Sequence, residues 1–212
     1  MYEPPAHREG DIAKLHALIE AQPLGLLISC GSQGLLANLA PFLLDPSGSR
    51  LGVLRAHLAR ANPQWRDLAA GAEALVVFRG VDAYVSPSWY ATKAETGKVV
   101  PTWNYVMAQA RGPARVIEDD AWLRRQIESL TAAHEAAREK PWAVGDAPED
   151  FIALQRRAII GVEIEIADLR GKWKVSQNRN DADRAGVVAG LESLGDDAAR
   201  AMAAIVRDAD RR

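Results

Sequence analysis

Short apolar runs separated by glycine and proline turns fill most of the first half of the chain. Five of these runs read as strands: Leu24–Cys30, Leu35–Leu44, Leu51–Ala56, Glu73–Phe78 and Ala83–Ser86. Tight turns are expected at Gly31–Gly34 and Pro46–Ser49. Two more strands are expected within Val99–Glu118, on either side of Gly112-Pro113, and Ala158–Ile166 alternates apolar and polar positions as a further strand. Short antiparallel strands joined by turns favour a barrel or a sandwich over a doubly wound sheet.

Other segments carry helix signals. Asp11 can cap a helix over Ile12–Gln22, and Asn62-Pro63 marks the start of a short helix that reaches about Ala70. Asp119 or Asp120 can cap a longer helix that runs to about Glu139. The remaining helices are predicted at Phe151–Arg156 and, as a pair separated near Gly195, within Asp181–Ala209. The sequence therefore predicts a mainly β protein with helices (α+β), with six to eight strands in a barrel-like arrangement and a C-terminal helical pair.

The length suits one main domain with a small addition. At 212 residues we expect one domain over residues 1–178, with residues 179–212 as a helical extension packed on it. An apolar fraction of 48% with 25% charged residues is ordinary for a globular protein. No apolar run approaches the roughly 18–20 residues of a membrane-spanning helix, and Met1–Gly10 lacks the apolar region of a secretory signal. We therefore expect a cytoplasmic protein with no membrane association.

The sequence lacks the motifs of several common kinds of binding and catalytic site. Cys30 is the single cysteine, which excludes an internal disulfide, and its apolar surroundings predict a buried small side chain. The four histidines are scattered, so no metal site is predicted. There is no glycine-rich dinucleotide fingerprint and no serine in a nucleophile-elbow context. No residue stands out as an acid–base catalyst, and the catalytic residues, if there are any, stay unidentified.

One pair of stretches points to a ligand. Tyr84–Tyr90 and Val99–Tyr105 each set aromatic rings beside Ser, Thr or Asn where an extended run meets a proline. Buried hydroxyl and amide groups need hydrogen-bond partners, so this mixture suits the wall of a site for a flat, polar-edged ligand. Between them, Ala91–Lys98 reads as a polar loop with cationic side chains. The alternative is a β-hairpin whose amphipathic aromatic residues lie at its rim.

These stretches also carry a resemblance to a known family. Further agreement comes from Met1–Pro4, His57–Trp65, Gly171–Arg179 and Asp183–Val187, in the same order along the chain. Together they resemble the PaiB-type family of FMN-binding negative transcriptional regulators, which have a split β-barrel of the FMN-binding type. The resemblance implies a homodimer that binds FMN in clefts shared by both subunits. It leaves open whether such a protein acts as an FMN-dependent oxidoreductase.

The resemblance and the residue chemistry together select candidate cofactor-binding residues. Arg60 has a forked charge suited to phosphate and stands, with His57, before a predicted helix start. Asn104 offers donors and acceptors that match the edge of a flavin ring, and Trp103 offers a surface for stacking. The full set is His57, Arg60, Asn62, Trp89, Lys98, Thr102, Trp103, Asn104, Lys172, Gln177 and Arg179. The alternative is structural: Arg60 and the lysines are then solvated charges, and the aromatic rings pack the end of the barrel.

Two positions depart from the family pattern. Leu39 and Gln109 stand where the resemblance leads us to expect histidines. Both changes remove a titratable side chain near the expected pocket, which keeps a flavin-free binding module on the same barrel as an alternative function.

A third alternative takes the family description literally and makes the protein a DNA-binding repressor. The net charge of −2 and the pI of about 6.1 give no sign of the basic stripe that phosphate binding requires. Residues 179–212 contain six basic and seven acidic side chains, so a recognition helix there would also be repelled by phosphates. The sequence therefore favours an indirect effect on transcription.

Overall fold

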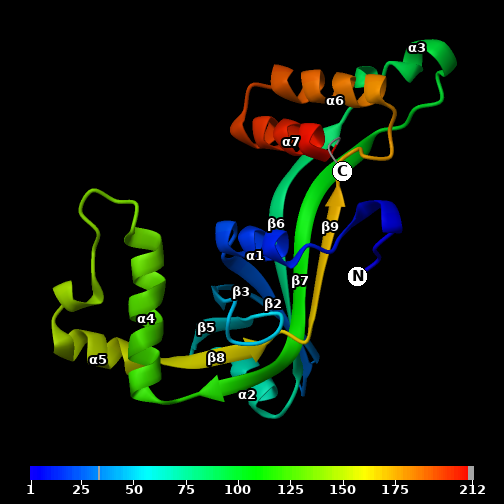
Figure 1. Cartoon of the computed structure of the whole chain (residues 1–212). Coiled ribbons are helices and arrows are strands. Elements are labelled where there is room, and N and C mark those ends of the chain that lie inside the picture. The colour runs from blue at the N-terminus through cyan, green and yellow to red at the C-terminus, as the bar shows by residue number, and fades with distance from the viewer. Residues whose placement is uncertain (33, 210–212) are drawn as a thin grey trace. The chain divides into compact units, whose positions relative to one another are not determined.

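A computed structural model describes residues 1–32 and 34–209, which form two compact units. Unit 1 comprises Met1–Asp11, Arg79–Ala108 and the described part of the chain from Arg170 onward. Unit 2 comprises Ile12–Phe78 and Gln109–Leu169, apart from Gln33. Two long strands, β6 (Glu73–Val85) and β7 (Thr102–Ile117), contribute residues to both units (Figure 1). The predicted boundary at residue 178 stays a prediction, and Gln33, Asp210, Arg211 and Arg212 lie outside the described residues.

Unit 2 is built mainly on antiparallel strands. Besides its parts of β6 and β7 it contains β2 (Leu24–Gly31), β3 (Gly34–Pro41), β4 (Leu43–Asp45), β5 (Val53–Ala59) and β8 (Ile159–Glu165). The strand order is β3-β2-β6-β7-β8-β5-β4. Over residues 1–32 and 34–209 this path begins at β3 and ends at β4, so the sheet is not closed. The predicted class, a mainly β protein with helices, is confirmed.

The core of unit 2 follows from the alternation of apolar residues in β8. Ile160, Val162 and Ile164 are fully buried, and their partners across the ladder in β5 are Leu58, Ala56 and Leu54. Side chains of paired antiparallel residues lie on the same face, so these six form one continuous apolar layer. The predicted one-sided burial of Ala158–Ile166 is confirmed. Other residues of unit 2 cover the apolar face of β8, so β8 has no uncovered apolar face that another molecule could contact.

The helices of unit 2 begin close to their predicted caps. They are α1 (Ile12–Ala21), α2 (Gln64–Ala69), α4 (Asp120–Glu135) and α5 (Glu149–Arg157), with a 3₁₀ turn at Val144–Asp146. Asp119 caps α4, its carboxylate accepting a hydrogen bond from the Trp122 amide at 2.7 Å. No helix within the described ranges has both the length and the apolarity to cross a membrane.

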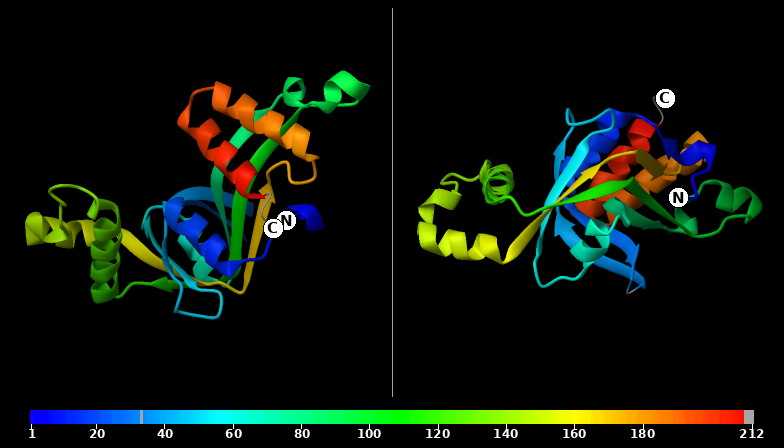
Figure 2. Two further views of the ribbon diagram at one scale, coloured as in Figure 1. Left: turned by 45° about the horizontal axis from the view of Figure 1, so that its top comes forward. Right: turned by 90° about the horizontal axis from the view of Figure 1, so that it is seen from below.

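Unit 1 joins both chain ends to the middle of the sequence. Its strands are the remaining parts of β6 and β7, β1 (Arg8–Glu9) and most of β9 (Asp168–Lys174), and β9 pairs with β1 and β7. Its helices are α3 (Thr92–Thr96), α6 (Asp181–Ser193) and α7 (Asp197–Asp208), with 3₁₀ turns at Pro5–His7 and Pro87–Trp89. Figure 2 shows α6 and α7 packed as a helical hairpin, which confirms the predicted pair.

Four local predictions were wrong. Val99–Glu118 contains one long strand, β7, rather than two, because Gly112 lets the backbone approach β8: a Cβ at this position would lie 1.9 Å from the Glu165 carbonyl oxygen. The two strands expected within Glu73–Ser86 are a single strand, β6, which ends at Val85, and the expected loop Ala91–Lys98 contains α3. Cys30 is exposed, because Leu27 and Ser29 face the core and the adjacent Cys30 therefore points to the opposite face of the strand.

Candidate functional site

The predicted site residues divide between the two units. His57, Arg60 and Asn62 lie in unit 2. The other eight lie in unit 1, on the 3₁₀ turn Pro87–Trp89, after α3, at the start of β7 and at the end of β9: Trp89, Lys98, Thr102, Trp103, Asn104, Lys172, Gln177 and Arg179. Each group is therefore described within its own unit.

Lys172 of β9 is buried against aromatic rings. Its side chain is only 8% exposed, and its ammonium lies 5.2 Å from the ring centre of Tyr2 and 5.4 Å from that of Tyr105. It donates a hydrogen bond to the Tyr2 carbonyl oxygen at 3.1 Å. Ring faces attract cations, which offsets part of the cost of burying this charge. Lys172 is therefore a fixed cation rather than a solvated one.

Lys174 extends the positive charge, and His7 lies beside the two lysines. Lys174 donates to the Trp103 carbonyl oxygen at 2.9 Å and to the Thr102 hydroxyl. Burial lowers its pKa, and the charges of Lys172 and Arg179 lower the pKa further, against an opposing effect of Tyr105. Burial likewise lowers the pKa of His7, against an opposing effect of the Gln177 side chain and with smaller lowering contributions from the two lysines. In residues 1–32 and 34–209 no carboxylate forms an ion pair with Lys172, Lys174 or Arg179, so an anion would relieve their mutual repulsion.

The turn after β9 is held by side chains from unit 1. Ser176 adopts φ 64°, the left-handed region that non-glycine residues rarely occupy, and its hydroxyl accepts a hydrogen bond from the buried Asn104 amide at 3.0 Å. The Gln177 side chain accepts from the Val175 amide at 2.8 Å and donates to the Trp173 carbonyl oxygen. Asn104 and Gln177 therefore shape the backbone that follows Lys174, and a strained residue held in this way is often part of a functional site.

Trp103 presents an aromatic surface beside this turn. Its side chain is 50% exposed, its indole N–H donates to Asp82 at 2.8 Å, and its ring meets Tyr84 edge to face at 5.9 Å. Arg79 forms an ion pair with the same Asp82. An exposed ring with a fixed orientation can stack on a flat ligand.

The remaining unit 1 candidates have mixed surroundings. Trp89 packs on α6, where a Cβ at Gly190 would lie 2.2 Å from its ring, so its indole serves helix packing. Lys98 is exposed.

Arg179 lies 4.5 Å from the ring centre of Tyr90, a buried residue whose hydroxyl has no hydrogen-bond partner in the described chain. The buried His7 Nδ1 also has none there. Unsatisfied buried polar atoms are costly, and two of them beside unpaired cations indicate a polar ligand.

Arg60 is already engaged within unit 2. Its guanidinium pairs with Glu118 at 2.8 Å and donates to the Arg157 and Ile159 carbonyl oxygens. The Asn62 side chain accepts a hydrogen bond from the amide of Gln64, the first residue of α2, at 3.0 Å. A phosphate at this position would have to compete with the Glu118 carboxylate, so a role of Arg60 in phosphate binding stays a prediction.

His57 lies inside β5 rather than in the connection after it. Its ring is mostly buried, and Nδ1 has no hydrogen-bond partner among the described residues. Burial lowers its pKa, because the imidazolium form would lose its hydration without gaining a partner.

The pKa of His57 predicts a pH dependence of stability. Its folded-state pKa is below the unfolded value of about 6.5, so the unfolded chain binds more protons as the pH falls from about 7 to 5. We expect the free energy of unfolding to decrease over that range, and to decrease less in His57→Gln. Urea unfolding at several pH values measures this. An equal decrease in both proteins would contradict it, and His134→Gln, at an exposed histidine, is the matched control.

The two positions that depart from the family pattern lie on β3 and β7. Leu39 is 63% exposed on β3, and Gln109 is partly buried in β7. Gln109 makes no side-chain hydrogen bond among residues 1–32 and 34–209.

We call Tyr2, His7, Tyr105, Lys172, Lys174 and Arg179 the cationic cluster of unit 1. The cluster provides fixed positive charge. Its member His7 has an unsatisfied Nδ1, and Tyr90, beside Arg179, has an unsatisfied hydroxyl. The exposed indole of Trp103 belongs to the residue whose carbonyl oxygen Lys174 contacts. Such an arrangement can bind an anionic group that is attached to a flat ring. Prediction from sequence missed Tyr2, His7, Tyr105 and Lys174 as members of the site. The alternation that places Lys172 and Lys174 on one face of the strand was a usable signal for Lys174.

Comparison with known proteins decides the family. A sequence model of the family described as "Putative FMN-binding domain" matches residues 1–168. The chain belongs to this family. It is 40% identical to an uncharacterized protein of Emericella nidulans, with 98% of this chain and 97% of that protein covered. It is 32% identical to the protease synthase and sporulation protein PAI 2 of Bacillus subtilis, with 72% of this chain and 70% of that protein covered. The PaiB-type resemblance is thereby confirmed.

Solved structures support the fold. The structure of the FAD and heme binding protein from Mycobacterium smegmatis superposes with a TM-score of 0.57 at 18% identity, covering 79% of this chain and 73% of that one. At this identity the likeness shows the fold alone, which is of the split-barrel type seen in flavin-binding proteins. The predicted split barrel is confirmed.

Proposed function

We propose that this protein binds FMN, or a similarly phosphorylated flat ligand, as a homodimer, and that any effect on transcription is indirect. The observation that carries the ligand is the cationic cluster of unit 1. Burial lowers the pKa of Lys174, the charges of Lys172 and Arg179 lower it further, and no carboxylate forms an ion pair with any of the three among the described residues. A dianionic phosphate would supply the missing charge and hydrogen-bond acceptors.

The residues present fit the rest of FMN as well. The Trp103 indole offers a stacking surface, and the Tyr90 hydroxyl and His7 Nδ1 are unsatisfied groups that polar atoms of the ligand would pair with. When bound, the flavin would supply electron-transfer chemistry of its own. The chain's residues would hold the phosphate, orient the ring and exclude water.

A second, uncovered apolar surface supports the homodimer. On one face of β2, β3 and β6 the paired side chains are all apolar or cysteine, and we call this the open sheet face: Leu24, Leu26, Ile28, Cys30, Leu35, Ala37, Leu39, Leu75 and Val77. Leu24, Leu35 and Leu39 are 58%, 76% and 63% exposed. Monomeric proteins rarely expose such a contiguous apolar patch, and β3 is an edge strand with unpaired backbone groups. A second copy of the chain would cover this face.

The charges of α6 and α7 support the indirect effect on transcription. Arg184, Arg200 and Arg207 each form an ion pair with an acidic residue of the same helical pair, namely Asp181, Asp197 and Glu192. Arginines that are already paired gain little from DNA phosphates. A sequence-specific complex of the protein with DNA at nanomolar concentration and physiological salt would contradict this part of the proposal.

A titration of the purified protein with FMN tests the function. Bound flavin is expected to shift the visible absorbance and quench the flavin fluorescence at one FMN per chain, in the low micromolar range or tighter. Riboflavin, which has the same ring without the phosphate, is the matched control ligand and is expected to bind at least about tenfold more weakly. Equal binding of both would reject the phosphate site, and binding of neither would favour a flavin-free module on the same barrel.

A further inference from the structure

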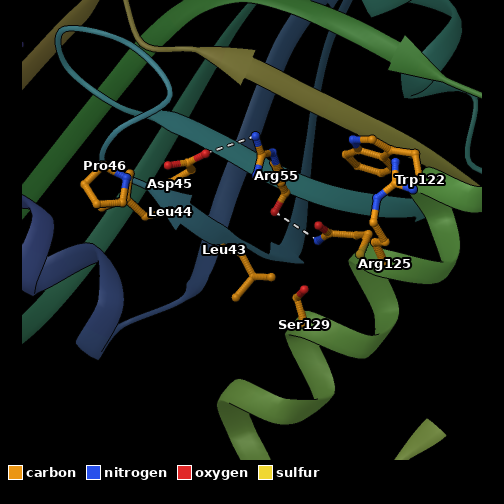
Figure 3. Close-up of a pocket in the computed structure, with 9 residues that line it drawn as sticks. Leu43, Leu44, Asp45, Pro46, Arg55, Trp122, Arg125 and Ser129 are labelled. Carbon is orange, nitrogen blue, oxygen red and sulfur yellow. Dashed lines mark hydrogen bonds and ion pairs between the residues drawn. The ribbon is translucent and has the colours of Figure 1, made fainter. Parts of the chain in front are cut away.

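A separate cavity lies entirely within unit 2. Its volume is about 540 Å³, in the range of small-molecule sites, and it is open to solvent on one side. We call it the α4 cavity. Figure 3 shows Leu43, Leu44, Asp45, Pro46 and Arg55 on the sheet side, and Trp122, Arg125 and Ser129 on α4. Gln126 of α4 completes the lining. None of these residues belongs to the candidate FMN site.

The sheet side of the α4 cavity is electrically balanced. Arg55 pairs with Asp45 at 3.1 Å and with Glu163 at 2.8 Å, and Glu163 also pairs with Arg115 at 2.7 Å. Burial alone would raise the pKa of Glu163, but the hydrogen bonds from Arg115 and Arg55 outweigh it and keep the pKa below its ordinary value. Arg55 is therefore held in place and has its charge compensated.

The Trp122 indole, the aromatic wall of the α4 cavity, is held in place by packing against the sheet. The Trp122 ring lies directly over Gly161 of β8, where a Cβ would come within 2.4 Å of the ring. Only glycine leaves room for the indole at this point of the sheet. The Asp119 cap fixes the start of α4 at the Trp122 amide, and Gln126 donates to the Arg55 carbonyl oxygen at 3.3 Å, which ties the helix to β5. The indole is thus a fixed surface.

The helix side carries an unused charge. Arg125 lines the cavity and, among residues 1–32 and 34–209, makes no hydrogen bond or ion pair. Ser129 follows it by one helical turn, so the guanidinium and the hydroxyl lie on the same side of α4. Its neighbour Arg124 faces elsewhere and is paired with Glu128 and Glu149. With Arg55 compensated, Arg125 leaves the cavity with one excess positive charge.

We propose that the α4 cavity binds a small aromatic carboxylate. The ring of the ligand lies beside the Trp122 indole and the apolar side chain of Leu43. Its carboxylate pairs with Arg125 and accepts a hydrogen bond from Ser129. A single positive charge favours a monoanion over a phosphate, and the aromatic wall favours a flat ligand over an aliphatic one. The site would give the protein a second small-molecule input beside FMN.

Calorimetric titration with two ligands of the same shape tests the proposal. Indole-3-acetate carries the carboxylate, and indole-3-acetamide replaces it by a neutral amide. The acetate is expected to bind in the millimolar range or tighter, and the amide at least about tenfold more weakly. Arg125→Gln should weaken acetate binding at least about tenfold, and Ser129→Trp, which fills the cavity from an exposed helix position, should abolish it. Arg124→Gln makes the same charge change on the same helix and should stay within about twofold of the unmodified protein.

Three results would overturn the proposal. Equal binding of the acetate and the amide would remove the anion site. Unchanged acetate binding in Arg125→Gln and Ser129→Trp would place any bound ligand elsewhere. Loss of FMN binding in Arg125→Gln would assign the cavity to the flavin and leave no separate site.

Discussion

Replacing Lys174 by glutamine is expected to weaken FMN binding by about 1.5–3 kcal/mol, or roughly 10- to 150-fold in Kd. The change removes one of the three cations of the cationic cluster, none of which has an ion-pair partner among the described residues, and leaves an amide donor on a slightly shorter side chain. Because burial and neighbouring charges already lower the pKa of Lys174, its removal should not destabilise the fold. Titration of flavin fluorescence measures the affinity, and urea unfolding checks the stability.

Two further variants make this result decisive. Lys93→Gln removes the same charge from an exposed position of unit 1 and should leave the affinity within about twofold. Arg60→Ala tests the site predicted from sequence, where the guanidinium is already paired with Glu118. A large loss in Arg60→Ala with none in Lys174→Gln would place the phosphate in unit 2 and contradict the cationic cluster as its site.

The strands were predictable from sequence where periodicity alone decides them. The alternation of Ile160, Val162, Ile164 and Ile166 gave the buried face of β8 correctly, because a strand with one buried face must repeat every two residues. The same reasoning failed at Gly112-Pro113, where a local turn signal was overridden by packing. Here glycine serves the close approach of β7 to the Glu165 carbonyl oxygen, which the sequence does not reveal.

The chemistry of the candidate site was only partly predictable for a similar reason. Residue type identified Lys172 and Trp103, but it could not show that Asn104 and Gln177 are used to hold the turn at Ser176. Nor could it show that Arg60 has Glu118 beside it. Tyr2 and His7 are distant in sequence from β9 and join it only through the pairing of β1 with β9. Long-range pairing decides which polar residues remain available to a ligand.

The α4 cavity escaped sequence analysis altogether. Trp122 and Arg125 lie in an ordinary amphipathic helix, and Arg55 lies in a strand with a mostly apolar pattern. The cavity exists because Gly161 admits the indole and because α4 is tied to β5 by Gln126. A cavity formed by two elements that are far apart in sequence leaves no local signal in either of them.

The proposed homodimer leads to the second large prediction, which concerns Leu39. Leu39→Glu is expected to weaken dimerisation by about 3–5 kcal/mol, more than roughly 100-fold in the dimer dissociation constant. Leu39 lies opposite Leu26 on the open sheet face, so a carboxylate there would be buried among apolar side chains without a partner when two copies associate. In the free chain the position is 63% exposed, so the substitution should leave folding intact. Sedimentation equilibrium over a range of protein concentrations measures the dissociation constant.

The matched control for Leu39→Glu is Leu154→Glu on α5. Leu154 is also in unit 2 and is 60% exposed, but it is not part of the open sheet face. The two variants add the same charge to equally exposed leucines, so a general effect of net charge on association would affect both alike. If the Leu39→Glu variant becomes monomeric and the Leu154→Glu variant stays dimeric, the dimer contact lies on β2, β3 and β6. A monomeric unmodified protein at low micromolar concentration, or a Leu39→Glu variant that stays dimeric, would mean that this apolar face is covered by something other than a second copy of the chain.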